Sequence, residues 1–201
     1  MKYSTNYIFY PVNRALERAV TNALHLLNDE AAVAAMPDTQ VTVADKFLYT
    51  RGNYELHHFS TNVLESAQAA LESALAAESD SLVRVNRLND LGNVLAALAQ
   101  IRADADVYRQ SIASFEKALE LVSQDAAPSE WAETQANLGT ALQALGRQEA
   151  NAKLLNAAVD AYTAALLVYS RTETPEKWLL VMHQLGGALH SYGLLLKGNR
   201  T

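Results

Sequence analysis

The sequence has no cysteine, only four prolines and eight glycines, and more acidic than basic residues. Without cysteine there are no disulfides, thiolate metal sites or cysteine nucleophiles. The formal net charge of -6 argues against nucleic-acid binding, because that work needs a cationic face. No run of about 18 apolar residues occurs and the first residues lead to no apolar signal segment, so we expect a cytoplasmic protein that does not insert into membranes.

What the chain does contain is alanine and leucine in a repeating pattern. Hydrophobic residues make up 50% of the chain, and its two dominant apolar residues are those that cost least in a helix. Residues 84–100, 131–147 and 178–194 align with one another at a spacing of 47. A Leu-Gly pair recurs in register, at Leu91-Gly92, Leu138-Gly139 and Leu185-Gly186. Leucines at i, i+4 and i+7 from each pair, with Tyr192 as the last of them in the third segment, predict one stripe of an α-helix.

The segments between these helices repeat at the same spacing. Ile112, Phe115 and Ala118 correspond to Val159, Tyr162 and Ala165, which predicts a second helix in each unit and hence helical hairpins. We expect turns at 101–104 and 146–149, and a helix that begins at Pro175 after an N-cap at Thr174. A glycine inside a helix costs roughly 1 kcal/mol against alanine, so its recurrence predicts that a second helix backbone crosses closely there.

The pattern weakens toward the N-terminus. Residues 56–78 predict a further second helix, for which 41–51 is the candidate partner, and 12–35 reads as one long helix. We therefore divide the chain into an N-terminal aromatic arm and long helix, residues 1–38, and a continuous helical-repeat region, residues 39–201.

The block from Trp131 to Gly146, followed by Ala158 to Leu166 and Pro175, resembles a tetratricopeptide repeat of the longer kind found in kinesin light chains and many bacterial proteins. The standard unit has 34 residues and a W…LG…Y…A…F…P signature. The resemblance implies an all-α, right-handed superhelix of antiparallel helix pairs, with about 3.5 repeats plus an N-terminal helix. It also implies a scaffold or adaptor that binds an extended peptide or a helix of another protein in a concave groove lined by the first helix of each pair.

Carried over by position, the groove residues are mostly amides. They are Asn86, Asn89, Asn93, Glu133, Asn137, Thr140, Gln143, His183, Gln184 and His190. The lysines and the arginine that clamp a C-terminal carboxylate are absent at these positions. Amides can donate to and accept from a peptide backbone, so the expected ligand is a neutral or mildly basic segment; the alternative is that these side chains only solvate an exposed face.

We find no combination of residues that predicts catalysis, a metal site or a cofactor. His57 and His58 are adjacent and point about 100° apart on a helix, whereas His183 and His190 lie two turns apart, too far to share one ion. Asp104 and Asp106 fit the start of a helix, where acidic groups interact favourably with free N–H groups. We therefore do not expect an enzyme.

Two segments outside the repeat support an alternative function, self-assembly into a homo-oligomer. The first residues include Tyr3, Tyr7, Phe9 and Tyr10, which either cover the open end of the first helix pair or form an arm that docks on another subunit or into the chain's own groove. The last helix ends in Leu194 and Leu195, which either cap the repeats or contact a second copy.

Overall fold

The computed structural model describes residues 10–26 and 61–198, and these residues form seven helices and no strand. The helices are α1 (Tyr10–Leu26), α4 (Thr61–Ala77), α5 (Ser81–Arg102), α6 (Ala105–Leu121), α7 (Pro128–Gln148), α8 (Ala152–Ala165) and α9 (Pro175–Gly198). The all-α prediction is confirmed. The predicted helix at 41–51, the pair His57-His58 and residues 1–9 lie outside the described residues.

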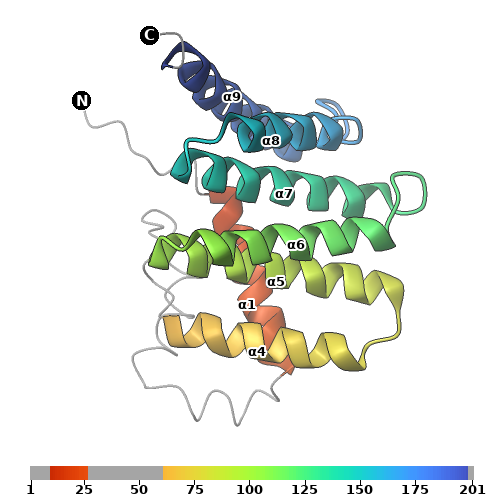
Figure 1. Ribbon diagram of the computed structural model, residues 1–201. Coiled ribbons are helices and arrows are strands. Elements are labelled where there is room, and N and C mark those ends of the chain that lie inside the picture. The colour runs from red at the N-terminus through yellow and green to blue at the C-terminus, as the bar shows by residue number, and fades with distance from the viewer. Residues whose placement is uncertain (1–9, 27–60, 199–201) are drawn as a thin grey trace.

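Helices α4 to α9 are stacked one after another (Figure 1). Because the connections are short, consecutive helices run antiparallel, with α5–α6 and α7–α8 as the two complete hairpins. Their turns are equivalent: Ala103 and Ala150, 47 residues apart, both have a positive φ. The next residues, Asp104 and Asn151, cap the second helices by accepting bonds from backbone N–H groups. The capping role of Asp104 is confirmed. A turn follows each first helix as predicted, but the second turn comes later than the predicted 146–149, because α7 continues to Gln148.

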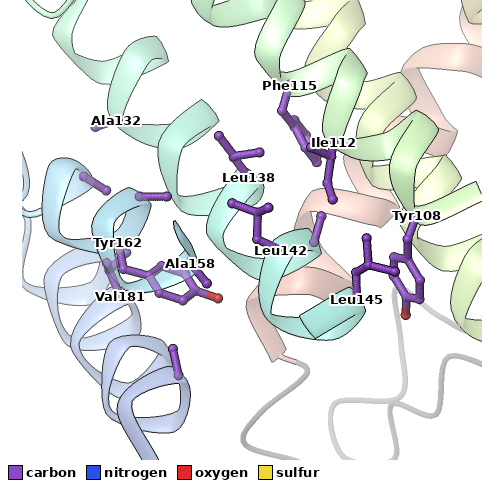
Figure 2. Close-up of a cluster of buried hydrophobic side chains, with 14 of the residues drawn as sticks. Tyr108, Ile112, Phe115, Ala132, Leu138, Leu142, Leu145, Ala158, Tyr162 and Val181 are labelled. Carbon is purple, nitrogen blue, oxygen red and sulfur yellow. The ribbon is translucent and has the colours of Figure 1, made fainter. Parts of the chain in front are cut away.

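The largest part of the core lies between the two hairpins and α9. Tyr108 and Phe115 from α6 point toward α7, and Tyr162 from α8 lies between α7 and Val181 of α9 (Figure 2). Phe115 and Tyr162 are fully buried. These side chains belong to the second-helix pattern that the sequence repeats, so the periodicity identified this part of the core correctly.

The repeated glycine has a different neighbour from the one we predicted. A Cβ atom on Gly92 would lie 2.5 Å from the ring of Phe115, and one on Gly139 would lie 2.8 Å from the ring of Tyr162. The space beside each glycine is therefore filled by an aromatic side chain of the following helix, and not by a helix backbone. On α9, no described atom lies within 4 Å of the equivalent position on Gly186.

Helix α1 breaks the stacking pattern. It crosses behind α4 and α5 at a steep angle (Figure 1) and packs on both of them. Leu16, Ala19, Val20 and Ala23 are buried in one cluster with residues of α4 and α5. Tyr10 and Pro11, which we placed ahead of any helix, are its first two residues.

The glycine contacts give a first prediction. Gly92→Ala and Gly139→Ala are each expected to lower the free energy of unfolding by about 1–3 kcal/mol, because the added methyl group overlaps a fully buried ring. Gly186→Ala is expected to raise it by about 0.5–1 kcal/mol through helix propensity alone. Urea unfolding followed by circular dichroism measures all three. Equal effects at the three positions would contradict a packing role for Gly92 and Gly139.

Candidate functional site

The first helix of each hairpin and α9 contribute to one face of the stack. Helix α5 contacts α7, and α7 contacts α9. We call the side chains that α5, α7 and α9 present on this side the A-helix face. Helix α1 crosses it, since α1 packs on α5 and Arg18 forms an ion pair with Glu133 of α7. This face carries the residues that the sequence predicted for a groove.

The predicted groove amides are brought together, and several of them bond to one another across neighbouring helices. The Asn89 amide donates to the Thr134 hydroxyl at 2.7 Å and to the backbone oxygen of Val85. The Asn137 amide donates to the Asn89 side-chain oxygen at 3.4 Å. The bonds that Asn89 makes with Thr134 and Asn137 join α5 to α7.

A second group of bonds joins α7 to α8 and α9. The Gln184 amide of α9 donates to the Thr140 hydroxyl at 3.0 Å. The buried Tyr162 hydroxyl of α8 lies 3.1 Å from both the Thr140 hydroxyl and the Gln143 side-chain oxygen. These polar side chains therefore hold adjacent helices together.

Other predicted residues make fewer hydrogen bonds or are exposed. Asn93 is buried, and among the described residues its amide nitrogen has no hydrogen-bond partner; the same holds for the side-chain oxygen of Gln184. Asn86, His183 and His190 are exposed. The predicted set therefore includes residues that bond between helices, the buried Asn93, and residues that are exposed.

A charged cluster joins α1 to the A-helix face. Asp90 of α5 is buried, accepts a 2.8 Å bond from the Asn22 amide and lies 3.8 Å from the Arg18 guanidinium. Arg18 also pairs with Glu133, whose other oxygen lies 4.0 Å from the Lys177 amine. Four helices, α1, α5, α7 and α9, are thus linked by charges of alternating sign.

Burial raises the pKa of Asp90 above its ordinary value, and the negative charge of Glu133 adds to this. The Asn22 hydrogen bond and the Arg18 charge lower the pKa but do not cancel the effect of burial. The folded protein therefore holds this proton more tightly than the unfolded chain does. At pH values above the pKa of Asp90 in the folded protein, the ionised carboxylate therefore lowers the free energy of unfolding. This loss becomes smaller as the pH falls through that pKa.

The sequence analysis missed the α1 side of this cluster. Asp90 sits in the aligned helix but repeats at Asn137 and Gln184, so periodicity did not mark it as ionic. Arg18 and Asn22 are one helical turn apart, and a polar pair on one side of the predicted N-terminal helix was the available signal. Only the position of α1 shows which residues that pair contacts.

The Asp90 environment gives a second prediction. Asp90→Asn keeps an oxygen for the Asn22 amide and removes the buried charge. We expect the variant to unfold at a higher urea concentration than the native protein at pH 7.5, and this advantage to shrink as the pH is lowered toward 4.5. Asp125→Asn, which changes an exposed carboxylate, is the control and should show neither effect. A variant that is less stable than the native protein at neutral pH would contradict the assignment.

Three further findings bear on the site. Among the described residues, no group of three or more His, Cys, Asp or Glu side chains could hold a metal ion. No described helix combines the length and apolar character needed to cross a membrane. No protein-family model, curated protein or solved structure matches the chain.

Proposed function

We propose that the protein is a protein-binding scaffold of the tetratricopeptide-repeat kind, whose A-helix face binds a helical segment of a partner. The 47-residue repeat, the equivalent turns and the glycine–aromatic contacts support the architecture. The observation that carries the function is α1, an amphipathic helix that lies across this face. In the superhelix that the resemblance implies, the A helices line the concave side, and the proposal takes α1 as the model for a bound ligand helix.

The contacts of α1 indicate what kind of helix the face accepts. Its apolar side, with Leu16 and Val20, is buried against α4 and α5. Its polar side places Arg18 and Asn22 on the carboxylates of Asp90 and Glu133. A partner helix that replaced α1 would need the same combination, which is an apolar stripe flanked by a cation and an amide donor.

The bonded amides make an extended peptide a poorer ligand than a helix. A peptide backbone that bonded to Asn89, Asn137 or Gln184 would first have to break bonds that join α5, α7 and α9. Replacing one hydrogen bond by another brings little net gain. A helix satisfies its own backbone and can bind through its side chains alone.

Self-assembly is the second candidate, and exposed leucines favour it. Leu194 is exposed, whereas Leu195 is half-buried. Tyr3, Tyr7 and Phe9, the other predicted contacts, lie outside the described residues, and the side chain of Tyr10 is not described. The third prediction distinguishes the two functions.

In this experiment a photo-cross-linking amino acid replaces Asn86, which is exposed on α5, or Lys117, which is exposed on α6 of the opposite helix layer. We expect covalent adducts with a second protein from position 86 and none from position 117. Adding Arg18→Glu should increase the yield at position 86 at least twofold, because the new carboxylate repels Asp90 and Glu133 and loosens α1. Mass spectrometry of the adducts identifies the partner.

The same experiment can reject the proposal. Adducts that form equally at both positions, or only at position 117, would contradict binding at the A-helix face. Adducts that contain only a second copy of this chain would establish self-assembly instead. If Arg18→Glu lowers the melting temperature and leaves the adduct yield unchanged, α1 is a permanent part of the core and does not occupy a ligand site.

A further inference from the structure

Helix α9 carries an exposed apolar stripe with a coiled-coil spacing. The stripe follows alternating steps of three and four residues, so its members lie along one side of the helix. They are Leu179, Met182, Gly186, Leu189, Gly193 and Leu196. We call these residues the α9 stripe. Between Trp178 and Leu196 the helix has no Asp, Glu, Lys or Arg, so the stripe has an apolar and not an ionic character.

The 47-residue repeat gives this stripe two equivalents in the same chain. On α7 the corresponding positions include Ala132, Gly139, Leu142 and Gly146, all of them buried. Tyr162 of α8 fills the space beside Gly139, and Leu155 of α8 lies 3.0 Å from where a Cβ on Gly146 would be. On α5 the equivalent of Gly139 is Gly92, which Phe115 of α6 covers in the same way.

On α9 the same surface is not covered by any described helix. Leu179 is 64% exposed and Leu189 is 49% exposed, whereas their equivalents on α7, Ala132 and Leu142, are 0% and 8% exposed. No described atom lies within 4 Å of a Cβ built on Gly186 or Gly193. The two positions that receive Tyr162 and Leu155 one repeat earlier are therefore open.

We infer that the α9 stripe is a second binding surface, which takes an amphipathic helix of a partner protein. The helix runs antiparallel to α9, places an aromatic ring over Gly186 and places an aliphatic side chain, seven residues earlier, over Gly193. The partner helix also has a small residue, which lies three positions after the aliphatic residue and four before the aromatic one. Leu155, Ala158 and Tyr162 of α8 show this spacing, and Tyr108, Ser111 and Phe115 of α6 repeat it with an aromatic first residue.

A second copy of α9 fits this surface less well than a helix with that pattern. Its own stripe has no aromatic residue, because Trp178 and Tyr192 lie about 80° and 120° away from Gly186 around the helix and are half-buried. Antiparallel pairing of two α9 helices about Leu189 sets glycine near glycine. A shifted register that places Leu189 over Gly186 and Met182 over Gly193 fills both spaces, but only with aliphatic side chains. An aromatic ring buries far more apolar area there, so a partner helix of the α8 pattern is the occupant that the surface favours.

The probe for this inference is the chain's own second helix. A fluorescein-labelled peptide with the sequence of residues 151–168 contains all three pattern residues, and anisotropy measures its binding to the intact protein. We expect Gly186→Leu, which fills the space with no described neighbour to displace, to weaken binding at least tenfold. Leu189→Glu should weaken it further, and a peptide with Tyr162→Ala should bind at least tenfold more weakly. Because the stripe has no charges, added salt should not weaken binding.

The control is Leu121→Glu, which changes a leucine of similar exposure at the end of α6 and should leave the affinity unchanged. Circular dichroism checks that each variant is folded. Absence of binding to the native protein would overturn the inference. So would binding that Gly186→Leu and Leu189→Glu do not change, which is also the result expected if the peptide displaces α8 from α7. If light scattering shows a dimer that Leu189→Glu converts to a monomer, the occupant is a second copy and the partner-helix inference is wrong.

Discussion

The contact between a glycine on the first helix of a hairpin and an aromatic ring on the second sets the geometry of the stack. Phe115 against Gly92 and Tyr162 against Gly139 let two helices approach closely while a large, fully buried ring fills the space between them. Each glycine costs about 1 kcal/mol in helix propensity. The apolar area of the ring that is buried against the glycine offsets this cost, and only a residue without a side chain leaves room for that ring. Because the contact recurs after 47 residues, successive hairpins have the same shape and can stack.

This dependence explains how much of the fold was predictable from the sequence. Residues such as Leu91 and Phe115 repeat at helical spacing, so the sequence alone identified the hairpins, their turns and most of their core. It could not distinguish an aromatic ring from a backbone as the neighbour of Gly92, because both require the absence of a side chain. Helix α1 has no equivalent in the repeat, so its long-range contacts with α4 and α5 followed from no periodicity.

The positions of the candidate site residues could be predicted from the sequence, but their hydrogen bonds to one another could not. The repeat correctly gathered Asn89, Asn137 and Gln184 on one side of the stack, yet the same regularity lets their side chains bond to each other across adjacent helices. Equivalent polar residues on stacked helices lie close together, and a buried polar group that is bonded costs less than one that is not. The amides therefore contribute to the joining of the helices. The function that we propose relies instead on the charges, of which Asp90 and Glu133 are bonded to α1.

The last described helix lacks the neighbour that the repeat gives to the equivalent helices before it. Within the described residues, α9 ends the stack with an apolar stripe that includes the repeated glycine, although no described ring needs that space. A surface that served only to face water would be better served by polar residues and by alanine in place of Gly186, since alanine favours the helix. The presence of both the leucines and the glycine is the pattern expected of a surface that packs against an aromatic residue of another helix.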